Sequence, residues 1–112
     1  MMKVLRQGDV LVRQIRRREP SGRDVREHGR VILAHGEVTG HAHEVVAAEP
    51  TTDVELPAAQ FFEQPDGRRF LFIERACLLT HQEHGAIAVP PGCYEVTRQK
   101  EYSPAAIRNV AD

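Results

Sequence analysis

The chain has 112 residues, a formal net charge of −1 and two cysteines, Cys77 and Cys93. This length predicts one domain, because domains usually hold roughly 100–200 residues. A charge near zero excludes a global field that would recruit nucleic acid or an anionic membrane, and two isolated cysteines do not make the disulfide framework of a small secreted domain. No apolar run approaches the roughly 20 residues of a membrane span, and no signal peptide is expected at the first residues. We therefore expect a cytoplasmic single-domain protein that does not enter a membrane.

The first half of the chain is expected to form short strands. A partly alternating segment follows the turn signal Gly8-Asp9, and a long polar loop is expected over residues 16–29. Two glycines, Gly36 and Gly40, bracket a short connection. The strands expected here are residues 10–15, 30–34 and 41–47.

The second half continues the β pattern. Pro65-Asp66-Gly67 predicts the turn of a hairpin, because proline presets φ and glycine tolerates positive φ. The expected strands are residues 60–63, 69–73, 86–89 and 93–99, with Tyr94, Val96 and Arg98 on one face of the last. Residues 78–80 lead into a turn expected over residues 81–85. A short C-terminal helix is expected at about residues 103–110, capped by Ser103. About seven short strands favour one mostly-β domain over residues 1–112, a small barrel or sandwich.

Four histidines are the most informative feature. His41 and His43 flank one residue of an expected strand, so both imidazoles point to the same face. His81 and His84 are three residues apart and precede Gly85, and a tight turn or a single helical turn would bring their side chains together. The spacing predicts that three or four of these rings meet at one metal ion.

The residue types indicate a divalent transition metal. Neutral imidazole suits such metals, and no thiolate cluster competes for the role. Zinc is the first choice, with iron, nickel or manganese as alternatives. Glu83 lies between two expected ligands and is the candidate general base toward a metal-bound water. In the competing interpretation the histidines bind no metal and form a polar cluster.

Two segments resemble the signature of the cupin family. Gly36, His41, His43 and Glu49 follow the order of the first cupin motif, and Gly85, Pro90 and Gly92 follow that of the second. Glu95 stands where the last cupin histidine would fall. The resemblance covers residues 36–95 and implies a double-stranded β-helix barrel, a metal site that includes a carboxylate such as Glu95, and a homodimer.

The whole chain also resembles a group of small uncharacterised bacterial and phage proteins. The segments that carry this resemblance are residues 36–43, 79–85 and 98–104. The group implies a domain that stands alone and implies no activity.

Further residues suggest ligands other than metal. Arg98 and Tyr102 are candidates for binding an anionic substrate, Arg98 through its planar fork of donors. The loop with Arg16-Arg17-Arg18 is locally basic and could bind nucleic acid, although acidic residues are interleaved with it.

Two classes of function follow. In the first, the chain is a metal-dependent hydrolase that acts on a phosphoester or another small anionic substrate. Oxygen chemistry at iron, with two histidines and one carboxylate, is a variant of this interpretation. In the second, the chain is a non-catalytic nucleic-acid- or protein-binding module, and the histidines only stabilise it.

Overall fold

The computed structural model describes residues 2–36, 38–49 and 57–99. Within these ranges the chain forms strands and no helix. The strands are β1 (Val4–Gln7), β2 (Val10–Ile15), β3 (Arg23–Asp24), β4 (Val31–His35), β5 (Ala42–Ala47), β6 (Ala59–Glu63), β7 (Arg69–Ile73), β8 (Cys77–Thr80), β9 (Ile87–Val89) and β10 (Gly92–Arg98). The expected C-terminal helix at about residues 103–110 lies outside the described residues.

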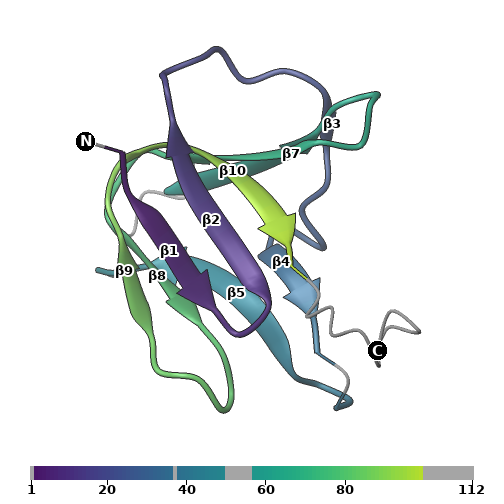
Figure 1. Cartoon of the computed structure of the whole chain (residues 1–112), viewed down its shortest axis with the longest axis vertical. Coiled ribbons are helices and arrows are strands. Elements are labelled where there is room, and N and C mark those ends of the chain that lie inside the picture. Colours follow the sequence, from purple (N-terminus) through teal and green to yellow (C-terminus); the bar gives the residue numbers. More distant parts are fainter. Residues whose placement is uncertain (1, 37, 50–56, 100–112) are drawn as a thin grey trace, which may run out of the picture.

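The strands make two antiparallel sheets (Figure 1). The larger sheet has the order β1-β2-β10-β7-β6-β3, and the smaller one has the order β4-β5-β8-β9. Strand β10 lies at the centre of the larger sheet and pairs with both β2 and β7. The mostly-β prediction is therefore confirmed in the form of two facing sheets.

One hydrophobic core fills the space between the sheets, because alternate residues of each strand point inward. Phe61, Leu71 and Tyr94 contribute from the larger sheet, and Leu33 and Leu79 contribute from the smaller one. The core is completed by Val10, Val12, Val31, Val45, Ala59, Ile73, Cys77, Val89 and Val96. The phenol of Tyr94 is fully buried and donates a hydrogen bond of 2.7 Å to the carbonyl of Pro90.

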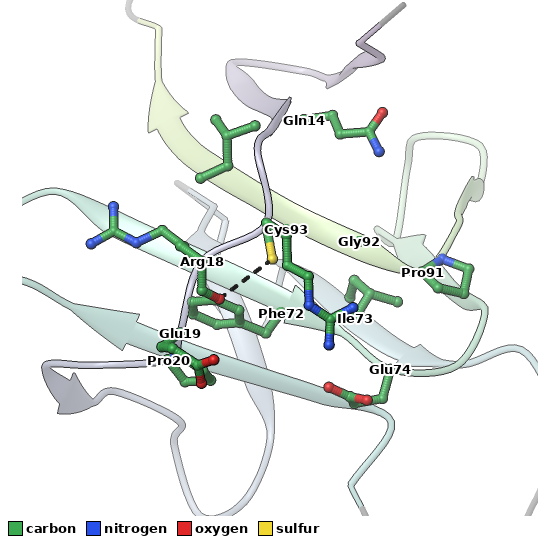
Figure 2. A pocket seen from close by; sticks show the side chains of 12 residues that line it. Gln14, Arg18, Glu19, Pro20, Phe72, Ile73, Glu74, Pro91, Gly92 and Cys93 are labelled. Atoms are coloured by element: carbon green, nitrogen blue, oxygen red, sulfur yellow. Dashed lines mark hydrogen bonds between the residues drawn. The ribbon is translucent and has the colours of Figure 1, made fainter.

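The outer face of the larger sheet is also partly covered. Phe70 and Phe72 are buried on this face by the chain that follows β2, where the guanidinium of Arg18 lies 4.1 Å from the centroid of the Phe70 ring. Figure 2 shows the adjoining pocket of about 420 Å³, in which the Cys93 thiol lies 3.9 Å from the carbonyl oxygen of Arg18. Part of the basic loop is thus used to cover the protein's own sheet.

Three local expectations need correction. Strand β1 and the two-residue strand β3 were not predicted, because both are short, and β3 lies within the segment expected to be loop. The strand expected over residues 41–47 begins one residue later, at Ala42, so His41 precedes it. His41 stays tied to its neighbour, since its carbonyl accepts a hydrogen bond of 2.8 Å from the amide of Gly36.

Candidate metal centre

A pocket of about 320 Å³ contains all four histidines. It lies where four segments meet: the β1–β2 turn, the chain that enters β5, the loop between β8 and β9, and the end of β10. The lining residues are Gly8, Asp9, Gly36, Val38, His41, His43, His81, Glu83, His84 and Arg98. The structure therefore brings together the predicted site residues His41, His43, His81, Glu83, His84 and Arg98. Tyr102 lies outside the described residues, and Glu95, which the cupin resemblance implies, lies elsewhere.

His43 is the most buried of the four, with 3% of its surface exposed. Its Nδ1 lies 2.8 Å from Oε1 of Gln7. His41 lies nearer the surface, and its Nδ1 is 3.0 Å from a carboxylate oxygen of Glu83. In both rings Nδ1 faces an oxygen of the protein, so Nε2 is the nitrogen that remains for a ligand.

His81 and His84 belong to the bend that follows β8. Nδ1 of His81 accepts the backbone amide of Glu83 at 3.0 Å and that of His84 at 3.4 Å. The His81 side chain thus closes its own turn, in the way that Asx turns are closed. This local hydrogen bond explains why a polar segment with a three-residue spacing folds back and directs both rings toward β5.

The ring positions match those of imidazoles that share an ion. Ring centroids are 4.4 Å apart for His43 and His81, 4.7 Å for His81 and His84, 5.6 Å for His41 and His81, and 5.9 Å for His43 and His84. Two imidazoles bound to one tetrahedral ion, each at about 2.0–2.1 Å, place their centroids roughly 5 Å apart. These four ring pairs are therefore at suitable separations for sharing an ion, whatever the orientations of the rings.

The orientations are not those of a finished metal site. Across residues 2–36, 38–49 and 57–99, no three His, Cys, Asp or Glu side chains are arranged so that they could hold a metal ion together as they stand. The hydrogen bonds of His81 explain why its ring is not oriented for metal binding. Its Nδ1 accepts hydrogen bonds, so the neutral ring carries its proton on Nε2, the nitrogen that a metal would need. Binding a metal through this ring requires a change of rotamer or of tautomer.

Asp9 is a site residue that sequence reasoning missed, because it was interpreted only as part of a turn. One carboxylate oxygen lies 3.7 Å from Nε2 of His43, and the other accepts a hydrogen bond of 2.6 Å from Nε of Arg98. A separation of 3.7 Å is close to that of two ligand atoms at about 2.1 Å from one ion. The turn residue thus adds a carboxylate to the pocket.

The β1–β2 turn reaches the pocket because of Gly8. Its φ is 59°, whereas Asp9 keeps a negative φ, as in the type II′ turns of two-residue hairpins. A Cβ at this position would lie 3.0 Å from Nε2 of His84 and 3.3 Å from Cε1 of His43. Glycine is therefore required here by both the turn and the close approach of the rings.

Burial and neighbouring charges set the protonation of three groups in the pocket. Burial and the neighbouring His81 lower the pKa of His43, and burial and His84 lower the pKa of His81, so both rings are neutral at pH 7. Burial alone would raise the pKa of Asp9, but the hydrogen bond and charge of Arg98 outweigh it and lower the pKa. Asp9 is therefore ionised at pH 7.

Glu95 does not join the histidines. It alternates with Tyr94 and Val96, which face the core, and so points to the outer face of the larger sheet. Its carboxylate accepts hydrogen bonds from Arg13 at 2.9 Å and from Arg68 at 3.1 Å. The carboxylate that the cupin resemblance implies as a ligand is thus bound to two arginines elsewhere.

This arginine-bound carboxylate gives a pH-dependent contribution to stability. The hydrogen bond of Arg68, together with that of Arg13, holds the pKa of Glu95 below its ordinary value of 4.5. The stabilisation is complete above that ordinary value and is lost as the pH falls through the lower pKa of the folded state. We expect Glu95→Gln to lower the free energy of unfolding at pH 7 by about 1 kcal/mol, since both arginines are largely exposed.

Thermal unfolding at pH 7 and at progressively lower pH checks this expectation. The difference between Glu95→Gln and the unmodified protein must shrink in acid. Glu63→Gln is the matched control, because the hydrogen bond of Glu63 to Arg23 is longer, at 3.3 Å, and that arginine is exposed. A difference that is unchanged in acid would contradict the assigned charge.

The remaining histidines lie outside the pocket. His28 is exposed and has a φ of 54°. The ring of His35 bonds to Glu27 at 2.9 Å, while its backbone carbonyl accepts a hydrogen bond of 3.1 Å from Arg98. His35 therefore supports the pocket only through its backbone.

The fold and the pocket define a two-sheet β domain with a histidine cluster at one end. The chain belongs to the family described as Domain of unknown function (DUF8820), which it matches over residues 6–99. Neither the curated proteins nor the solved structures provide a match. In the ranges described, no helix is both long and apolar enough to span a membrane.

Proposed function

We propose that the histidine pocket binds a divalent transition metal ion, with zinc as the first choice and iron, nickel or manganese as alternatives. The observation that carries the proposal is the convergence of four imidazole rings on one pocket, from two segments far apart in the chain, with His81 5.6 Å or less from each of the other three ring centroids and His43 5.9 Å from His84. Neutral imidazoles are the preferred ligands of such metals.

The proposed first ligands are Nε2 of His43, Nε2 of His41 and the carboxylate of Asp9. His43 and His41 each direct Nδ1 to an oxygen of the protein, the arrangement that commonly orients metal-bound histidines. His81 or His84 would complete the set after a change of rotamer. Both lie in an exposed loop, so this rearrangement costs little packing.

The charge of the pocket favours a cation over an anion when no metal is bound. Among the described lining residues, two carboxylates, Asp9 and Glu83, oppose one guanidinium, that of Arg98. With His43 and His81 neutral, these carboxylates outnumber the guanidinium. A divalent ion would reverse the sign, and an anionic substrate could then bind.

The activity that we propose for the metal-loaded protein is hydrolysis of a phosphoester or another small anionic substrate. A metal-bound water would be the nucleophile. Glu83 is the proposed general base, since its largely exposed carboxylate can turn from His41 toward that water. Arg98 and Tyr102 are the proposed contacts to the anion.

The alternative is a non-catalytic nucleic-acid- or protein-binding module in which the histidines are structural. The exposure of Arg16 and Arg17 favours a role of this kind for the basic loop. A cytoplasmic location, a cupin-like barrel and a homodimer also stay predictions. The free thiols of Cys77 and Cys93 agree with a reducing compartment.

Metal analysis of protein purified without an affinity tag tests the proposal. We expect about one equivalent of metal, and removal of the metal with a chelator should lower the melting temperature. Addition of zinc at about one hundred times its dissociation constant should restore roughly 2.7 kcal/mol. Protein that contains no metal and shows no shift with zinc, iron, nickel or manganese would overturn the proposal.

The number of protein ligands on the metal then distinguishes the hydrolase from the structural role. X-ray absorption that gives three protein ligands and an exchangeable water supports the hydrolase, because catalytic sites keep an open position. Four protein ligands and no water support the structural role.

A further inference from the structure

We infer that Gln7 is a positioning residue for the pocket: its side-chain amide fixes His43 in the tautomer that carries the proton on Nδ1 and presents the Nε2 lone pair to the ligand. The inference extends the proposed metal function to a residue that does not itself line the pocket. The role of Gln7 in metal binding depends on the proposed function, but the tautomer of His43 can be measured without any metal.

The orientation of the Gln7 amide is set by its surroundings. Its nitrogen lies 3.0 Å from the carbonyl oxygen of Leu79 and 3.0 Å from that of Gly85. Carbonyl oxygens only accept hydrogen bonds, so the atom facing both must be the NH₂ group, which has two donors. A flipped amide would place an oxygen against two oxygens.

This orientation leaves a single role for the other end of the amide. Oε1 of Gln7 faces Nδ1 of His43 at 2.8 Å, and an amide oxygen can only accept. Nδ1 of His43 must therefore donate, and in a neutral ring Nε2 is then unprotonated. That nitrogen is the one directed toward Asp9, at 3.7 Å.

Burial makes the constraint strong. Gln7 is 2% exposed and His43 is 3% exposed, so water cannot replace a lost partner of either side chain. A buried acceptor or donor without a partner costs about 1–3 kcal/mol. The opposite tautomer would leave Oε1 of Gln7 without its donor and would set the Nδ1 lone pair against that oxygen.

The same hydrogen bonds link the pocket to the loop that carries the other histidines. Gln7 lies on β1, Leu79 on β8 and Gly85 directly after His84. The Gln7 amide thus fixes the tautomer of His43 and also bonds to Leu79 and Gly85, which flank the loop with His81 and His84. The His41–Glu83 contact repeats the Nδ1-to-oxygen pattern, but its carboxylate is 66% exposed and is free to move.

Nitrogen NMR of His43 tests the inference in metal-free protein. At about pH 8, where imidazoles with a pKa near 6.5 are neutral, two-bond correlations between ring protons and nitrogens distinguish the tautomers. The signal is assigned by its absence from His43→Gln. We expect protonated Nδ1 in the unmodified protein. Gln7→Met, which keeps no acceptor, should shift His43 toward protonated Nε2.

A stability control separates positioning from general damage. Tyr94→Phe removes another buried hydrogen bond, the one to Pro90, far from the pocket, and should leave the tautomer unchanged. In zinc titrations Gln7→Met should bind roughly 10–100-fold more weakly, the usual effect of losing an outer-shell partner. Tyr94→Phe should bind zinc as the unmodified protein does.

Each result is decisive. Protonated Nε2 in the unmodified protein, or a tautomer that is the same in Gln7→Met, overturns the inference. If the tautomer behaves as expected and no variant binds metal, the inference about Gln7 holds and the proposed metal function fails.

Discussion

Replacing His43 with alanine is expected to reduce metal affinity by more than about 100-fold, because a direct ligand is lost and outer-shell changes alone cost 10–100-fold. The same change should lower the free energy of unfolding by roughly 2–4 kcal/mol, since it leaves a cavity and removes the donor to Oε1 of Gln7. Isothermal titration with zinc and thermal unfolding measure the two effects.

Two further variants keep this test clear. His28→Ala removes an exposed histidine outside the pocket and should change neither quantity. His41→Ala removes a half-buried ring and should weaken metal binding with a smaller loss of stability. If His43→Ala lowers stability while zinc still binds as before, the ion is held elsewhere or not at all.

Replacing Phe61 with alanine is expected to lower the free energy of unfolding by about 3–5 kcal/mol. Phe61 is 1% exposed and belongs to the core between the sheets, where truncation leaves a cavity. A small domain has only about 5–15 kcal/mol of stability in total. The melting temperature should therefore fall by more than about 10 °C.

The neighbouring residue supplies the control. Phe62 is half-buried and points to the other face of the sheet, where its ring contacts that of Phe72 with centroids 5.9 Å apart. Phe62→Ala should cost about 1 kcal/mol, the scale of one aromatic pair. Similar losses for the two variants would contradict the assignment of inner and outer faces.

Features that depend on residues close together in the chain could be predicted from the sequence. The hairpin around Pro65-Asp66-Gly67 forms as expected between β6 and β7, with a φ of 91° at Gly67. Alternation along residues 93–99 predicted one shared face for Tyr94, Val96 and Arg98. In the structure Tyr94 and Val96 belong to the core, and Arg98 lines the histidine pocket. The same alternation puts Glu95 on the opposite face, which the cupin resemblance did not take into account.

The convergence of the two histidine pairs could be anticipated only in outline. The two-residue spacing of His41 and His43 requires one face of an extended chain, and the bend at residues 81–84 closes through the side chain of His81 itself. Each pair is thus set by local geometry. That both pairs face one pocket follows from the pairing of β5 with β8, which places Glu44 opposite Thr80.

The sequence by itself determined a small β domain, its main turns and two histidine pairs, because backbone preferences and side-chain alternation act over a few residues. Only the tertiary structure decided that Gln7 and Asp9 belong to the pocket, since their partners are distant in the chain. Gln7 lies 72 residues from Leu79, and Asp9 lies 89 residues from Arg98. Such contacts depend on strand order and register, which no local pattern specifies.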